Sequence, residues 1–94
     1  MTNTVKVGSV VISTAGRDSG RNFLVVGIQD DNYVYIADGN LRRLAKPKKK
    51  KLKHIASTPH MLEGIGDKLN EGKKVFDAEI RSALLNLKEA GKEN

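Results

Sequence analysis

The chain has 94 residues, enough for one small domain with a short appendage, and only 38% of them are hydrophobic, so any core is small. It has no cysteine, which excludes disulfides, thiolate metal sites and a cysteine nucleophile and suits a reducing cytoplasm. Its 17 Lys and Arg residues outnumber its 11 Asp and Glu residues, and the resulting net charge of +6 favours an anionic partner.

The start of the chain, MTNTVKVGS, lacks the basic stretch and apolar run of a secretory signal. No run approaches the roughly 20 apolar residues that cross a bilayer. We therefore expect a soluble, cytoplasmic protein without a membrane partner.

Five short segments predict β-strands. They are rich in β-branched or aromatic residues, or lie between turn-forming residues, and they comprise residues 5–12, 23–29, 33–37, 41–44 and 52–56. Each of the first two segments contains three consecutive apolar residues, Val10 to Ile12 and Leu24 to Val26, so alternation does not tell which face is buried. Five short strands joined by tight turns predict a small barrel.

The pattern changes to helical spacing after residue 57. Thr58 and Pro59 have the chemistry of an N-cap followed by a first-turn proline, and Gly72 is suited to end the helix. The apolar positions between them are Leu62, Ile65 and Leu69.

A second helix follows, with Asp77 as a candidate cap and Gly91 as its expected end. Its apolar stripe consists of Phe76, Ile80, Leu84 and Leu87. Neither helix is long enough to be stable alone, so the stripe must pack on the barrel, on the other helix or on a partner. The sequence thus predicts a mainly β fold with an α appendage, divided into a barrel over residues 1–57 and a helical C-terminal extension over residues 58–94.

The strongest functional signal is a cluster of positive charge in residues 41–54, LRRLAKPKKKKLKH. Eight cations lie there with no acidic residue among them: Arg42, Arg43, Lys46, Lys48, Lys49, Lys50, Lys51 and Lys53. A polyanion would relieve their mutual repulsion and release counterions on binding. A solvated basic loop or a targeting tag is the alternative. Because ordered-looking sequence flanks the cluster on both sides, we predict contact with nucleic acid.

The segment STAGRDSGR, residues 13–21, joins the first two predicted strands. It is not a P-loop, because Gly16 and Gly20 have the wrong spacing and no Lys-Ser or Lys-Thr pair follows them. The glycines permit a chain reversal, and Asp18 can hydrogen-bond back to the turn. Arg17 and Arg21 would then point outward, where the planar guanidinium suits phosphates and base edges. A plain turn with incidental arginines is the alternative.

The remaining motifs do not indicate catalysis or a cofactor. Gly64 and Gly66 resemble the start of a dinucleotide-binding fingerprint, but they follow no strand and lack the third glycine. His54 and His60 have no carboxylates that we can place beside them as metal ligands. We expect no enzyme, no metal, no cofactor and no small-molecule substrate.

Two parts of the chain resemble a known family. The run from Val10 to Gly20, followed by Phe23 to Val26, is similar to a KOW motif, in which strand, glycine-bearing loop and strand form part of an SH3-like barrel that binds RNA. The continuation Asp38-Gly39, Lys46-Pro47-Lys48 and Lys53-His54-Ile55 is similar to the KOW proteins related to the fourteenth large-subunit protein of eukaryotic and archaeal ribosomes. Small bacterial KOW-domain RNA-binding proteins share this pattern.

This resemblance covers about residues 6–56 and implies an SH3-like five-stranded barrel that binds structured, ribosomal RNA in translation. The residues expected to face RNA are Arg17, Arg21, Arg42, Arg43, Lys46, Lys48, Lys49, Lys50, Lys51, Lys53 and His54. Tyr33 and Tyr35 could add stacking on an unpaired base, with ordinary packing as the alternative.

Residues 62–94 are nearly neutral, because they contain seven acidic residues. We therefore expect an accessory ribosome- or RNA-associated protein rather than a core ribosomal subunit, with a protein docking on the helices as a further partner. A core large-subunit protein and a transcription elongation factor-like KOW module remain alternatives.

Overall fold

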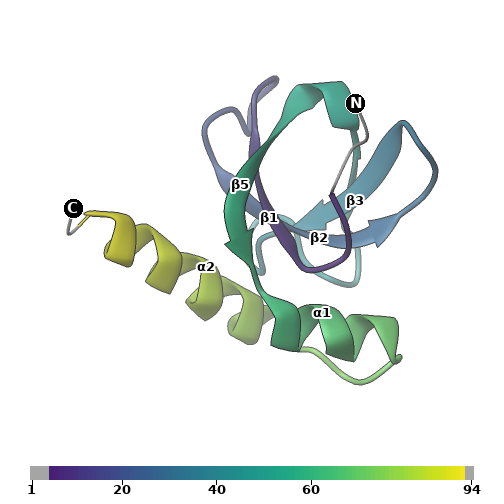
Figure 1. Cartoon of the computed structure of the whole chain (residues 1–94), viewed down its shortest axis with the longest axis vertical. Coiled ribbons are helices and arrows are strands. Elements are labelled where there is room, and N and C mark those ends of the chain that lie inside the picture. The colour runs from purple at the N-terminus through teal and green to yellow at the C-terminus, as the bar shows by residue number, and fades with distance from the viewer. Residues whose placement is uncertain (1–4, 93–94) are drawn as a thin grey trace.

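A computed structural model describes residues 5–92 of the chain. The apolar runs form four of five strands, and the lysine run forms the other. In chain order the elements are β1 (Ser9–Ser13), β2 (Asn22–Ile28), β3 (Tyr33–Ala37), β4 (Lys48–Lys51), a 3-10 turn (Leu52–His54), β5 (Ile55–Met61), α1 (Glu63–Asn70) and α2 (Asp77–Lys92). All strand pairs are antiparallel, and the sheet has the order β4-β3-β2-β1-β5. The sheet curls strongly, and both helices lie at one end of it (Figure 1). The predicted fold class, mainly β with a helical appendage, is confirmed.

The strand expected at residues 41–44 is wrong. Residues 41–44 form turns instead, because the Asp38 carboxylate accepts backbone N–H bonds from Asn40 and Arg42 at 2.9 Å and closes the chain into a loop. The fourth strand is the lysine run, whose backbone pairs with β3 so that Lys51 lies opposite Tyr33 and Lys49 lies opposite Tyr35. Lysine has a low strand propensity, so this strand depends on its pairing partner rather than on its own sequence.

The predicted helix start at Thr58 and Pro59 is also wrong, because β5 continues to Met61 and α1 begins only at Glu63. The Thr58 hydroxyl donates to the carbonyl of Val10 at 2.7 Å, which ties β5 to β1. Pro59 is tolerated because β5 is the last strand of the sheet, where a missing N–H need not break a ladder. Ser57, where we divided the chain into two parts, therefore lies within β5, and that division stays a prediction.

Neighbouring residues of β1 and β2 are both buried because each face of the sheet has its own core. One cluster consists of Val11, Phe23, Val25, Val34 and Ile36, and Leu52 and Ile55 pack against it. The other joins the opposite face to the helices and consists of Val10, Leu24, Ile65, Ile80 and Leu84. This arrangement explains why the sequence showed no alternation of apolar and polar residues in these strands.

The helices follow the predicted apolar spacing with two corrections. Leu62, Ile65 and Leu69 pack together in the helix-facing core, as do Ile80, Leu84 and Leu87. Phe76, however, is 59% exposed and lies outside the stripe, and α2 continues through Gly91 to Lys92. Gly72 ends α1 as expected, because its φ of 75° permits the bonds from Gly72 N–H to Leu69 and from Lys73 N–H to Lys68 that close a Schellman motif.

The start of α2 packs directly on the turn that follows β3. Gly39 has a φ of +79°, and a Cβ at this position would overlap the carbonyl oxygen of Asp77. The Arg81 guanidinium donates to the Gly39 carbonyl at 2.9 Å, and the Asp77 carboxylate accepts the Leu44 N–H at 2.8 Å instead of capping its own helix. The helix therefore fixes both ends of the loop between β3 and β4.

We expect Gly39→Ala to destabilise the protein more than Gly20→Ala does. Both glycines have positive φ, which costs an alanine about 1–2 kcal/mol, but only Gly39 faces backbone, while a Cβ at Gly20 meets nothing within 4 Å. The overlap with Asp77 adds about 1–3 kcal/mol. Urea denaturation of both variants measures the difference, and equal losses would contradict the close packing of this turn on α2.

Candidate nucleic-acid interface

Two loops at one end of the sheet are joined by ion pairs between their side chains. The first loop (residues 14–21) joins β1 to β2, and the second loop (residues 38–47) joins β3 to β4. Asp18 of the first loop accepts a hydrogen bond from Arg42 of the second at 3.2 Å, and Asp38 of the second loop pairs with Arg21 of the first at 3.4 Å. Lys48, at the start of β4, adds an ion pair to Asp18 at 3.6 Å. Each loop therefore supplies the carboxylate that holds an arginine of the other.

The Asp18 side chain is only 6% exposed, so its charge depends on these partners. Burial alone would raise the pKa of Asp18, but the hydrogen bond and charge of Arg42, together with Lys48, outweigh burial and hold the pKa below its ordinary value of 3.8. We expected Asp18 to bond within its own turn, but its side chain contacts Arg42 of the second loop and Lys48 of β4 instead. The reversal of the first loop through Gly16 and Gly20, with φ of 81° and 86°, is confirmed.

Lys50 of β4 also holds the first loop, through a hydrogen bond. The Lys50 ammonium donates to the carbonyl of Ala15 at 2.9 Å, and the residue is only 8% exposed. Its neighbours Lys49 and Lys51 point to the opposite face of the strand and are exposed. Lys50 thus differs from the rest of the charge cluster, in which we expected every lysine to face a ligand.

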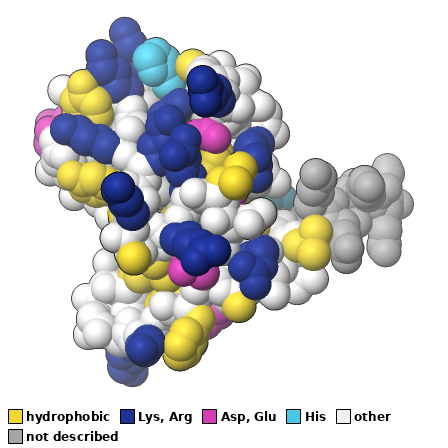
Figure 2. All heavy atoms as spheres, turned by 180° about the vertical axis from the view of Figure 1, so that it is seen from behind, with side chains coloured by type: hydrophobic (Ala, Val, Ile, Leu, Met, Phe, Trp, Pro, Cys, Tyr) yellow, Lys and Arg dark blue, Asp and Glu magenta, His cyan; other side chains and the backbone are white. Residues whose placement is uncertain are grey.

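The other residues predicted to face RNA remain accessible to different degrees. Arg42 and Lys48 are about one-third exposed, at 34% and 33%, and Arg21 is 43% exposed despite its ion pair. His54 is half-buried in the 3-10 turn. The fully exposed members are Arg17, Arg43, Lys46, Lys49, Lys51 and Lys53. Figure 2 shows that Lys and Arg side chains gather over the sheet end of the molecule on the face drawn there.

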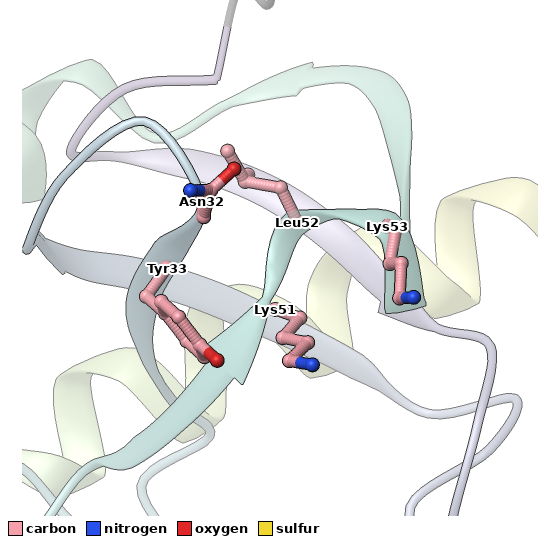
Figure 3. Close-up of a pocket in the computed structure, with 5 residues that line it drawn as sticks. All are labelled: Asn32, Tyr33, Lys51, Leu52 and Lys53. Carbon is pink, nitrogen blue, oxygen red and sulfur yellow. The ribbon is translucent and has the colours of Figure 1, made fainter.

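A pocket of about 270 Å³ lies at the start of β3, beside the exposed lysines of β4. Its lining residues are Asn32, Tyr33, Lys51, Leu52 and Lys53, drawn in Figure 3. The Lys49 ammonium lies 4.6 Å and that of Lys51 6.0 Å from the centre of the Tyr33 ring, at cation–π distance. Tyr35, in contrast, donates its hydroxyl to Gln29 at 2.7 Å. Asn32 and Leu52 carried no functional signal in the sequence, because only the fold brings the turn before β3 next to the end of β4.

Within residues 5–92, no three His, Asp or Glu side chains come together in a group that could hold a metal ion. Neither described helix is long and apolar enough to cross a membrane.

The fold and site define a small curled β-sheet protein with a basic surface of loops and one strand, extended by two helices. No family model matches the chain. It is, however, 31% identical to the large ribosomal subunit protein eL14 of Hyperthermus butylicus over 80 residues, 85% of this chain and 74% of that protein. It is 34% identical to the eL14 protein of Methanococcus vannielii over 59 residues, 63% of this chain and 70% of that protein. The chain belongs to the eL14 family of large ribosomal subunit proteins, which confirms the resemblance seen in the sequence.

Other matches cover less of the relative. The eL14 protein of Desulfurococcus amylolyticus is 33% identical over 54 residues, and the match spans 56% of its length. The match to the Pyrobaculum arsenaticum protein spans 61% of that protein. The chain thus corresponds to little more than half of several of these relatives.

We expect Asp18→Asn to lower the stability at neutral pH by about 1–2 kcal/mol, the lower part of the range for hydrogen bonds to charged groups, because Arg42 and Lys48 are partly solvated. Since folding lowers the pKa of Asp18, its stabilising effect is fully present above the ordinary pKa of 3.8, begins to decline below that value, and is lost as the pH falls through the lower pKa of the folded state.

The measurement is urea denaturation of wild type and variant between pH 7 and pH 3, with the exposed turn variant Asp31→Asn as control. The gap between wild type and Asp18→Asn should narrow on acidification. A gap that is constant across this range would contradict a stabilising role for the ionised carboxylate.

Proposed function

We propose that this protein binds structured ribosomal RNA and acts in translation in association with the large ribosomal subunit, without catalysing a reaction. The observation that carries the proposal is the position of the exposed cations, which lie together on β4 and its flanking loops in a chain of the eL14 family. The relatives' names describe ribosomal subunit proteins and no enzyme. Association with ribosomes would make the protein cytoplasmic.

Within this surface we assign three kinds of role. Arg17, Lys46, Lys49, Lys51 and Lys53 are exposed and have no ion pair among the described residues, so they are free to neutralise phosphates. Arg21, Arg42 and Lys48 contact the buried carboxylates and would present only their outer donors to RNA. Lys50 serves the fold by holding the first loop.

Folded RNA fits this surface better than B-DNA does. The cations lie on a strand and on loops, and neither described helix has the net positive charge expected of a helix that enters a major groove. Shape, phosphates and 2′-hydroxyl groups of a folded RNA offer contacts to such a surface.

We expect the triple variant Lys49→Gln, Lys51→Gln, Lys53→Gln to weaken binding to every structured RNA tested by a similar factor. Each lost phosphate contact should also flatten the dependence of log K on log salt by about 0.7 to 0.9. Titrations at several salt concentrations measure both quantities. The matched control replaces Lys6, Lys73 and Lys74, which are also exposed but lie off this surface. If the two triple variants lose the same amount of RNA affinity, the loss reflects net charge alone and not the position of the lysines.

Two forms of ribosome association differ in their salt dependence. Family membership is equally consistent with a core large-subunit protein, whereas the nearly neutral composition of residues 62–94 favours an accessory protein. We expect the protein to co-sediment with large subunits at low salt and to be released by a high-salt wash. Retention at one copy per subunit after the wash would establish the core alternative. Absence from ribosomes together with capture of RNA polymerase would favour an elongation factor-like module.

A further inference from the structure

The pocket beside β4 is bounded by two segments that are fixed relative to each other. The Leu52 N–H donates to the carbonyl of Asn32 at 2.8 Å, which ties the 3-10 turn to the turn before β3. That second turn is itself closed by Asp30, whose carboxylate accepts the N–H groups of Asn32 and Tyr33 at 2.8 and 3.0 Å. The bond from Asn32 holds the pKa of Asp30 below its ordinary value, so this closure persists at neutral pH. The pocket is therefore formed before any ligand arrives.

The contents of the pocket combine an aromatic ring, an apolar side chain and cations. In Figure 3 the Tyr33 ring and the Lys51 side chain lie next to each other on paired strands, with Lys53 beyond Lys51. The Tyr33 ring and Lys51, whose ammonium lies 6.0 Å from the ring centre, both belong to the pocket lining, whereas Lys49, 4.6 Å from the ring centre, does not. An aromatic face next to ammonium groups matches the two chemical parts of a nucleotide, a flat base and a phosphate.

The remaining wall supplies hydrogen bonding. The Asn32 carboxamide lies beside Leu52 at the pocket (Figure 3), and no side-chain hydrogen bond of Asn32 occurs among the described residues. A carboxamide offers a donor and an acceptor together, which is the combination that reads a base edge. In a fully paired helix the base edges and faces are not available in this way, whereas an unpaired nucleotide exposes both.

We propose that this pocket binds a single unpaired nucleotide of the bound RNA, with its base stacked on Tyr33 and its phosphates held by Lys51 and Lys53. Asn32 then contacts the base edge. This proposal rests on the proposed function, since it adds a subsite to the same RNA surface. The two exposed lysines of β4 then have different roles: Lys49 neutralises phosphates in general, whereas Lys51 helps to hold the one unpaired nucleotide.

The chain itself provides a direct probe, because it contains two tyrosines and no tryptophan. In a Tyr35→Phe background the ultraviolet emission comes from Tyr33 alone, and stacking of a base on a tyrosine ring quenches its emission. The two RNA probes are a hairpin with a single-nucleotide bulge and a fully paired hairpin of equal length and absorbance. We expect both to bind, and only the bulged hairpin to quench Tyr33 at saturation.

Affinity gives the second readout. We expect the bulged hairpin to bind the wild type about five-fold or more tightly than the paired hairpin, the factor that corresponds to the low end of measured base–aromatic stacking. Tyr33→Leu should weaken binding of the bulged hairpin more than binding of the paired hairpin and so remove this preference, while Tyr33→Phe, which keeps the ring, should retain it. Thermal melting of both variants checks that the fold is intact.

The outcomes separate the two proposals. If both hairpins bind equally and neither quenches Tyr33, the nucleotide subsite is refuted while RNA binding stands. If neither hairpin binds, the proposed function fails together with the subsite. Loss of ribosome association in Tyr33→Leu without any change in RNA affinity would assign the pocket to a protein partner instead.

Discussion

The arrangement of the basic surface depends on two buried carboxylates, Asp18 and Asp38, each of which pairs with an arginine of the other loop. A buried carboxylate is costly unless cations and hydrogen-bond donors compensate it, and neither loop contains both members of a pair. Asp18 takes its cations from Arg42 and Lys48, and Asp38 takes its cation from Arg21. The loops between β1 and β2 and between β3 and β4 can therefore reach a low-energy conformation only together. A surface made of loops is thereby given a defined shape, which recognition of folded RNA requires.

The lysines of β4 have two different roles, although they form one continuous run in the sequence. Strand geometry sends successive side chains to opposite faces, so Lys50 turns inward to the Ala15 carbonyl, while the ammonium groups of Lys49 and Lys51 lie 4.6 and 6.0 Å from the centre of the Tyr33 ring. The inward lysine fixes the loop that carries Arg17, and the outward pair remains available to an anion. Repulsion within the run is reduced because neighbours alternate in direction. A disordered run of the same composition would have the charge without this separation.

The helices are part of the structural support of the surface. They cover the outer face of the sheet through Ile65, Ile80 and Leu84, and α2 also contacts the second loop through Asp77 and Arg81. The nearly neutral composition of the helical segment agrees with a role in packing, because a surface that faces the core gains nothing from added charge.

The sequence by itself determined the features that depend on nearby residues. These are the strand at residues 33–37, the glycine reversals, the Gly72 helix end, the stripe of Ile80, Leu84 and Leu87, and the concentration of charge. The family resemblance was carried by the same short motifs. Only the tertiary structure decided that a lysine run is β4, that Thr58 belongs to β5, and that Asp18 pairs with Arg42 rather than with its own turn. Only the tertiary structure also joined Asn32 to Leu52 beside Tyr33. The physical reason is that propensity and spacing act over a few residues, whereas these strand pairings and charge contacts join residues 12 or more positions apart, such as Ile36 and Lys48 at a separation of 12 and Asp18 and Arg42 at a separation of 24.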